Sequence, residues 1–140
     1  MPKRRIEFTI WGEPKTKGSV TAFKAKNSDR VIVSHGKKSK AWESICADAA
    51  SEAMGDAPVF ESACAMYVLF TLPQAASNKT DWPAGKTFDL DKLLRALWDG
   101  LTGRLWDDDG RCAEVHGKKL WVGADGALPR PGVRVVVEEL

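Results

Sequence analysis

The sequence predicts a single α+β domain in which two helices pack on one face of a small mixed β-sheet. The chain has 140 residues, which is enough for one domain with its own core. Its apolar content of 44% and charged content of 29% are typical of a globular protein. Segments with strand and helix periodicity follow one another in the order β, hairpin, α, β, α, β, β. We therefore expect residues 1–140 to form one domain.

The first part of the chain predicts a strand, a hairpin and a helix. Residues 5–11 alternate polar and apolar side chains, as a half-buried strand does. Residues 19–24 and 31–34 are expected to pair as a hairpin. A helix is predicted at 39–54, with Ser39 as its N-cap and Gly55 at its end. Its expected apolar stripe consists of Trp42, Ile45, Cys46, Ala49 and Ala53.

The second part predicts a strand, a long loop, a helix and two more strands. Residues 63–72 are rich in β-forming side chains and predict a central strand. The loop at 73–88 is long for a compact domain, so it is expected to be functional or mobile. Apolar residues then recur at helical spacing over 91–101. The last two strands are expected at 112–122 and 133–138, on either side of a loop rich in glycine and proline.

Charge and cysteine content narrow the possible functions. The net charge is +2, but without the five aspartates around the helix at 91–101 there are 21 basic and 14 acidic residues. A basic surface with an acidic centre suits a phosphodiester substrate. Three widely spaced cysteines without a CxxC pair argue against zinc–thiolate and disulfide frameworks and favour a reducing cytoplasm. No apolar run approaches a membrane span, and the basic N-terminus leads into a strand rather than a signal peptide.

Two groups of aspartates flank the helix predicted at 91–101. Asp89 and Asp91 lie at its start, and they share one side if the chain is extended over 89–91. The helix is about 16 Å long, and the five residues after it can span a similar distance back. Asp108 and Asp109 can therefore return to the first pair. Four converging carboxylates would offer the hard oxygen ligands that Mg²⁺ prefers.

Each acidic group also has an ordinary structural interpretation. Acids at helix starts are common N-caps, and the Asp109-Gly110 step is typical of a turn. Arg95 lies one helical turn beyond Asp91. It either forms an i,i+4 salt bridge with that residue or stabilises transition-state charge at the metal. A metal nuclease and a non-catalytic nucleic-acid-binding module therefore both remain open.

The same stretch resembles the RusA family of Holliday-junction resolvases. The resemblance rests on Asp-Leu-Asp-Lys-Leu-Leu-Arg-Ala-Leu-Trp-Asp at 89–99 and Leu-Trp-Asp-Asp-Asp at 105–109, with weaker support from the Gly-Glu-Pro-Lys-Thr-Lys-Gly loop at 12–18. It implies a small homodimeric, Mg²⁺-dependent endonuclease of phage or prophage type, in which Mn²⁺ substitutes. Such enzymes resolve four-way DNA junctions by paired phosphodiester hydrolysis in recombination and repair. Cleavage of other branched or flapped DNA is the alternative activity.

The resemblance also implies roles for individual residues. Asp89, Asp91 and Asp109 would be the metal ligands, and Asp108 would be a neighbouring catalytic acid. Arg95 stands where the family carries a catalytic lysine; it keeps the charge but is a poor proton donor. In this resemblance Asp107 is expected only to be solvated.

Two further positions depart from the family pattern. Lys92 replaces the usual asparagine, and Gly100 replaces the alanine that follows the acid at Asp99. Lysines elsewhere are expected to contact DNA phosphates. The expected DNA contacts are Lys15, Lys17, Lys92 and Lys118, with Lys37, Lys38 and Lys119 as further candidates.

Overall fold

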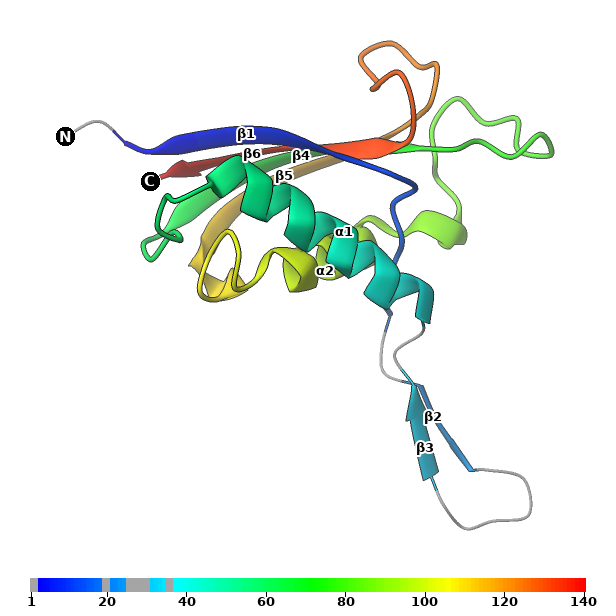
Figure 1. Cartoon of the computed structure of the whole chain (residues 1–140). Coiled ribbons are helices and arrows are strands. Elements are labelled where there is room, and N and C mark those ends of the chain that lie inside the picture. The colour runs from blue at the N-terminus through cyan, green and yellow to red at the C-terminus, as the bar shows by residue number, and fades with distance from the viewer. Residues whose placement is uncertain (1–2, 19–20, 25–30, 35–36) are drawn as a thin grey trace.

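The computed structural model describes residues 3–18, 21–24, 31–34 and 37–140 (Figure 1). Its main sheet has the strand order β1-β6-β4-β5. Strands β1 and β4 each pair antiparallel with β6, whereas β5 runs parallel to β4, so the sheet is mixed as predicted. The four strands are β1 (Arg5–Trp11), β4 (Cys64–Leu72), β5 (Cys112–Trp121) and β6 (Gly132–Glu139).

Two helices cover one face of this sheet, which confirms the predicted fold class (Figure 1). They are α1 (Lys37–Met54) and α2 (Leu90–Leu101). Alternate residues of the central strands point into the layer between sheet and helices, where Val133, Val135 and Val137 are fully buried. Short 3-10 turns, η1 (Lys86–Phe88) and η2 (Asp109–Arg111), lie before and after α2.

The predicted hairpin is present as a separate two-stranded sheet. Strand β2 (Thr21–Lys24) pairs antiparallel with β3 (Val31–Ser34), and the pair projects away from the main body (Figure 1). Residues 19 and 20 of the predicted first strand lie outside the described residues. The hairpin prediction is therefore confirmed for the two segments that the structure describes.

Helix α1 differs from its prediction at its start and on its buried side. It begins at Lys37, so Ser39 is not an N-cap; the buried Ser39 Oγ instead donates to Glu43 Oε2 at 3.0 Å. Ile45 is 44% exposed, and Ala53 is also exposed. Because α1 contacts both α2 and β1, the apolar residues that it buries are spaced four apart along the helix. This buried row consists of Trp42, Cys46, Ala50 and Met54.

The two helices approach closely at Gly100, on the buried side of α2. A Cβ atom added there would lie 2.8 Å from both the Glu43 carbonyl oxygen and the Cys46 Cβ. Real Cβ atoms do not tolerate such distances to backbone, so the crossing requires glycine at this position. The physical reason for the departure from the family alanine is therefore helix packing.

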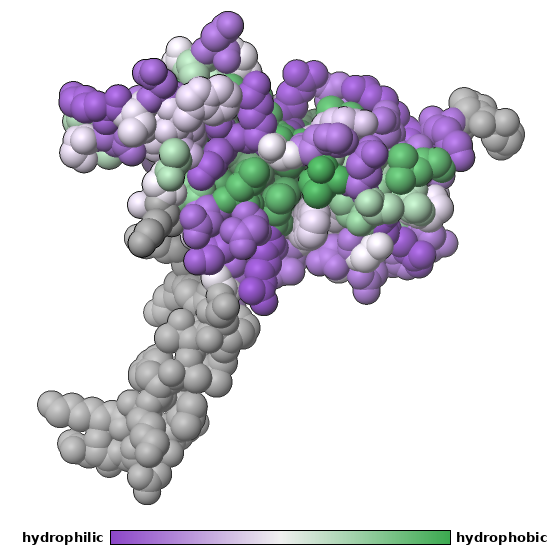
Figure 2. Space-filling view, turned by 180° about the vertical axis from the view of Figure 1, so that it is seen from behind, coloured by the Kyte–Doolittle hydropathy of each residue, from purple (hydrophilic) through white to green (hydrophobic). Residues whose placement is uncertain are grey.

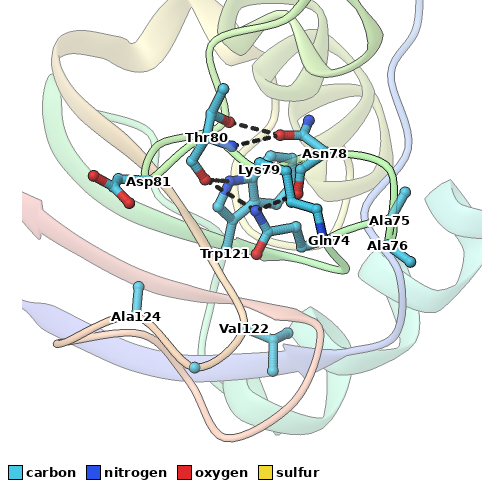
Figure 3. Close-up of a pocket in the computed structure, with 11 residues that line it drawn as sticks. Gln74, Ala75, Ala76, Asn78, Lys79, Thr80, Asp81, Trp121, Val122 and Ala124 are labelled. Carbon is cyan, nitrogen blue, oxygen red and sulfur yellow. Dashed lines mark hydrogen bonds between the residues drawn. The ribbon is translucent and has the colours of Figure 1, made fainter.

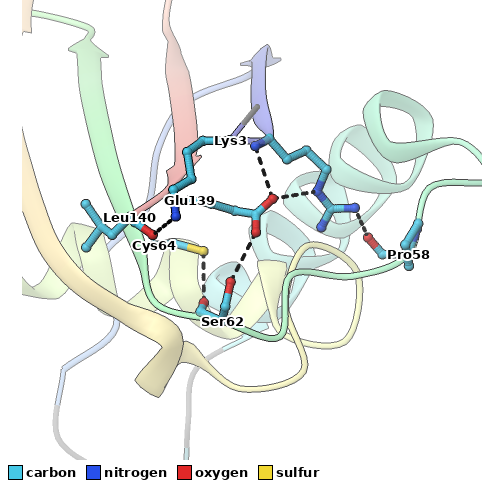
Figure 4. Close-up of polar contacts among 7 residues, drawn as sticks. Lys3, Pro58, Ser62, Cys64, Glu139 and Leu140 are labelled. Atoms are coloured by element: carbon cyan, nitrogen blue, oxygen red, sulfur yellow. Dashed lines mark hydrogen bonds and ion pairs between the residues drawn. The ribbon is translucent and has the colours of Figure 1, made fainter. Parts of the chain in front are cut away.

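Hydrogen bonds join the N-terminal and C-terminal segments at one edge of the protein body (Figure 4). Glu139 accepts hydrogen bonds from the Arg4 backbone N–H at 3.1 Å and from the Ser62 hydroxyl at 3.2 Å. Lys3 Nζ donates to the Leu140 carbonyl at 2.8 Å. These contacts join β1, β6 and the segment that enters β4.

The surface of the body is mixed in character. Seen from behind, a band of hydrophobic residues crosses it between hydrophilic groups (Figure 2). Of the helices in the described part of the chain, none combines the length and apolarity that a bilayer span requires.

Candidate functional site

The first turn of α2 presents Asp89 and Asp91 to solvent. Asp89 has extended backbone angles (φ −62°, ψ 129°) and stands at the N-cap of α2, but its side chain accepts no capping hydrogen bond. The helix begins at Leu90, so the extended backbone expected over 89–91 is observed only at Asp89, and Asp91 already lies in the first helical turn. The two carboxylates therefore do not share one side of an extended segment. Asp89 Oδ2 lies 3.4 Å from Lys92 Nζ, and Asp91 is exposed. Carboxylate oxygens at this end of the helix are thus available for further ligands.

This turn is held in place from strand β5. The Leu90 side chain packs over Gly117, where an added Cβ would lie 3.6 Å from both Leu90 methyl carbons. Lys119 Nζ donates to the Phe88 carbonyl at 2.6 Å. One apolar contact and one hydrogen bond therefore fix the backbone on both sides of Asp89.

The three aspartates after α2 have three different environments. Asp107 forms a two-point ion pair with Arg111, at 2.8 Å to Nε and 2.7 Å to Nη2, so it is paired rather than only solvated. Asp108 caps η2 by accepting the Gly110 N–H at 2.7 Å. Burial, followed by the negative charges of Asp108 and Asp99, raises the pKa of Asp109. Asp109 is therefore a half-buried carboxylate under repulsion from its acidic neighbours.

Arg95 lies on the exposed side of α2. Within the described residues it forms no ion pair, so the alternative of an i,i+4 salt bridge with Asp91 is not observed. Its guanidinium retains its donors for an external anion.

Lys17 occupies a different position from the one expected of a DNA contact. Its Nζ lies 2.8 Å from Asp99 Oδ2 and 3.2 Å from Glu43 Oε1, and its side chain is only 18% exposed. Its backbone N–H donates to the Lys92 carbonyl at 3.1 Å. The hydrogen bond to Asp99 is the main cause of its raised pKa. Lys17 thus joins the loop after β1 to both helices, a structural position.

The other lysines that were expected to contact DNA differ in their exposure and in the side chains that they contact. Lys15 is 36% exposed and pairs only with its neighbour Glu13, at 3.4 Å. Lys118 is exposed and lies above the Trp82 ring, 5.7 Å from its centroid. Lys92 remains exposed beside Asp89. The side chains of Lys37 and Lys38 lie outside the described residues.

The expected convergence of four carboxylates is not observed. Across residues 3–18 and 37–140 and the two short described strands, no three acidic, histidine or cysteine side chains gather closely enough to hold a metal. The acids that act on Asp109 are Asp108 and Asp99, toward the far end of α2. The strand register explains this separation. Cys112 pairs with the start of β4, whereas Leu90 packs five residues further along β5, at Gly117.

The donor chemistry nevertheless fits a hard divalent cation. All the candidate ligands are carboxylates, which Mg²⁺ prefers. Burial is the main cause of the raised pKa of Asp109, and the repulsion from Asp108 and Asp99 that adds to it is the kind that a bound cation relieves.

The cysteines, by contrast, are unsuited to thiolate chemistry. Burial raises the pKa of Cys46, Cys64 and Cys112, and all three are free thiols. Nucleophilic attack and soft-metal binding both require the thiolate. The raised pKa of each thiol therefore disfavours both of these roles.

A polar hollow beside the site was not anticipated. It has a volume of about 540 Å³ and lies between residues 74–81 and 121–124 (Figure 3). The Thr80 carbonyl accepts hydrogen bonds from Gln74 Nε2 at 2.9 Å and from Trp121 Nε1 at 3.0 Å. The spacing of Asn78 and Thr80, typical of an Asx turn, is a sequence feature from which local order here could have been predicted.

Comparison with known proteins identifies one family. The model of the family described as "Endodeoxyribonuclease RusA" matches residues 12–137, which includes both acidic groups and the loop after β1. No curated protein matches the chain.

Proposed function

The chain belongs to the RusA endodeoxyribonuclease family, and on that premise we propose that it resolves four-way DNA junctions by Mg²⁺-dependent hydrolysis of paired phosphodiesters. The observation that carries the proposal is the first turn of α2. Asp89 lies there without a side-chain capping bond, Asp91 is exposed beside it, and Arg95, which forms no ion pair with the residues that the structure describes, follows one turn later. The oxygens of a capping carboxylate accept hydrogen bonds from the backbone of the helix, whereas those of a metal ligand must be free of such bonds.

Asp89 and Asp91 would bind the divalent cation, with Mn²⁺ able to replace Mg²⁺. Asp109 does not gather with them among the described residues, and we retain it as the third candidate ligand because its carboxylate lies beside other acids. When bound, the cation would acidify a coordinated water and neutralise charge on the phosphate. Asp108 orders the turn that carries Asp109, because its carboxylate caps the backbone of η2.

Positive side chains around the acids would bind and orient the DNA backbone. Arg95 can grip a phosphate with two parallel N–H donors, which supplies charge stabilisation without proton donation. Lys92, Lys15 and Lys118 are exposed or partly exposed and would add phosphate contacts. Lys17 is already paired with two carboxylates, so a structural role for it fits better than a phosphate contact.

A four-way junction presents two strands for cleavage, related by approximate two-fold symmetry. A homodimer with C2 symmetry would present two such sites. We place this activity in the recombination or repair of DNA in a bacterial or phage-infected cytoplasm.

The test is a cleavage assay on labelled four-way, flap and linear duplex DNA, with Mg²⁺ and with EDTA. We expect the wild type to cut the four-way junction in Mg²⁺ only, and Asp91→Asn to be inactive. Asp48→Asn is the matched control, because Asp48 is an exposed acid on α1. No cleavage of any substrate by the wild type would exclude the enzyme and favour the non-catalytic binding module. Equal cleavage of all three would exclude junction selectivity.

Oligomeric state is tested separately by sedimentation with and without a four-way junction. A dimer, either free or on the DNA, is expected. A monomer under both conditions would rule out paired incision within a single complex.

A further inference from the structure

Trp82 is the most exposed large hydrophobic side chain in the described part of the chain, at 56%. It lies in the loop between β4 and η1, seven residues before Asp89. An indole in water is an available surface for a flat apolar partner. Such a partner binds more tightly when the ring is already held in place by the fold.

The turn that carries Trp82 is held by hydrogen bonds, of which those among Gln74, Asn78, Thr80 and Trp121 are drawn in Figure 3. Asn78 Oδ1 accepts from the Thr80 N–H at 3.0 Å, and the Thr80 hydroxyl lies 2.8 Å from the Trp82 carbonyl. Through its own carbonyl, Thr80 is bonded to Gln74 and to the indole of the buried Trp121. The backbone at Trp82 is thus anchored to the end of β5, which lowers the entropic cost of binding.

A positive charge lies beside the Trp82 ring, and strand β5 contacts both this ring and the turn that carries the acids. Lys118 Nζ is 5.7 Å from the ring centroid. The next residue, Lys119, donates to the Phe88 carbonyl, directly before Asp89. Neighbouring strand residues point to opposite faces, so Lys118 and Lys119 contact the exposed indole and the acidic turn from the two sides of the edge strand β5.

We propose that Trp82 is a stacking platform for a nucleobase that is unstacked at the branch point of DNA, with Lys118 contacting a neighbouring phosphate. This inference rests on the proposed function and assigns a selectivity residue to it. Bases within a continuous duplex are covered by their neighbours, so a single exposed ring has no free face to engage there. A branch point supplies such a face. Trp82 would consequently favour branched over linear DNA.

The experiment measures binding of an immobile four-way junction and of a linear duplex, in an Asp91→Asn background that prevents cleavage. Trp82→Ala should weaken junction binding by about 5- to 150-fold, the range expected for loss of one base–aromatic stack. Binding of the linear duplex should change by less than about 2-fold, and Trp82→Phe should retain most of the junction affinity. Lys118→Ala should instead reduce the salt dependence on both DNAs.

Trp11→Ala is the matched control. Trp11 is also exposed, at 40%, and has the Arg130 guanidinium 4.3 Å from its ring centroid, but it lies on β1 at the opposite edge of the sheet. Thermal melting of each variant verifies folding.

Three outcomes would overturn the stacking proposal: unchanged junction binding by Trp82→Ala, equal losses on both DNAs, or an equal loss from Trp11→Ala. If the wild type neither binds nor cuts a junction, the proposed function itself fails. If it cuts junctions while Trp82→Ala binds them normally, only the stacking role fails.

Discussion

Both ends of α2 carry aspartates, but among the described residues only the carboxylate at the C-terminal end is closely paired with a cation from another part of the fold. At the C-terminal end, Asp99 pairs with Lys17 Nζ at 2.8 Å, beside the close helix crossing at Gly100. At the N-terminal end, Asp91 is exposed, and Asp89 has only the exposed Lys92 nearby, at 3.4 Å. One end has its negative charge neutralised within the fold, and the other retains it.

This difference separates a structural role from a chemical one. A carboxylate that is paired with a lysine already has its charge compensated and one oxygen engaged. An exposed carboxylate without capping bonds keeps its oxygens available, and it costs the fold little if it is removed. The comparison therefore predicts that substitutions at the two ends have opposite effects on activity and on stability.

The largest effect is expected from Asp91→Asn. Junction cleavage should fall by more than about 100-fold, since loss of even an outer partner of a metal ligand costs roughly 10- to 100-fold. The melting temperature should hardly change, because Asp91 is exposed. Asp99→Asn should show the reverse pattern, with lower stability and little loss of cleavage. A folded Asp99→Asn protein that cannot cut DNA would contradict the structural role of Asp99.

Gly100→Ala should be the most destabilising change at the C-terminal end. The added methyl would meet the Glu43 carbonyl oxygen at 2.8 Å, and backbone cannot move aside cheaply. We expect a loss of roughly 1–3 kcal/mol in the free energy of unfolding, measured by urea titration. Gly85→Ala is the control, since nothing lies within 4 Å of its added Cβ. Equal stability of the two variants would show that the crossing is not tight.

Lys17→Met should cost about 1 kcal/mol in the free energy of unfolding at pH 7, because it leaves Glu43 and Asp99 without their cation. The pKa of Lys17 is raised above its ordinary 10.5. Its stabilisation is therefore fully present below pH 10.5 and is lost as pH rises through the raised value. Urea titrations at pH 7 and above pH 10.5 should show the two proteins converging in alkali. Lys15→Met, which breaks only a local pair, is the control.

Asp109→Asn should have the smallest effect, a gain of a few tenths of a kcal/mol at pH 7 without metal. The pKa of Asp109 is raised, so its ionised form opposes folding. As pH falls through that raised value the carboxyl is protonated, and the advantage of the variant should disappear. Denaturant titrations at pH 7 and pH 4 in EDTA measure this.

Added Mg²⁺ provides a second measurement on the same pair of proteins. It should stabilise the wild type, because a ligand that binds the folded state raises its stability, and it should stabilise Asp109→Asn less. Equal responses to Mg²⁺ would remove Asp109 from the ligand set.

Much of the fold could be predicted from the sequence because its periodicities are local. The strands at β1 and β4 and the helix α2 were predicted to within one residue of their bounds. The buried side of α1 was predicted only in part: Trp42 and Cys46 are buried as expected, whereas Ile45 is exposed. Ile45 and Ala49 fit a helical stripe as well as Cys46 and Ala50 do. Only the contact with α2 decides between these two rows.

The candidate site was predicted in composition but not in arrangement. The acids and Arg95 were recognised from a short contiguous pattern. The partners of Lys17, by contrast, are Glu43, which lies 26 residues away, and the still more distant Asp99, relations that no local spacing reveals. The position of Asp109 depends on the register of β5 against β4, which the polar sequence of the turn does not specify.

The strand order has a consequence for how the protein is made. Strand β6 lies between β1 and β4, although it follows all the other elements along the chain. While a ribosome synthesises the chain from its N-terminus, β1 has no partner in the main sheet, and β4 lacks one of its two neighbours. The layer that supports both helices cannot close until β6 emerges. We therefore expect the acids around α2 to remain unassembled on the nascent chain, so that DNA cutting begins only after translation has passed β6.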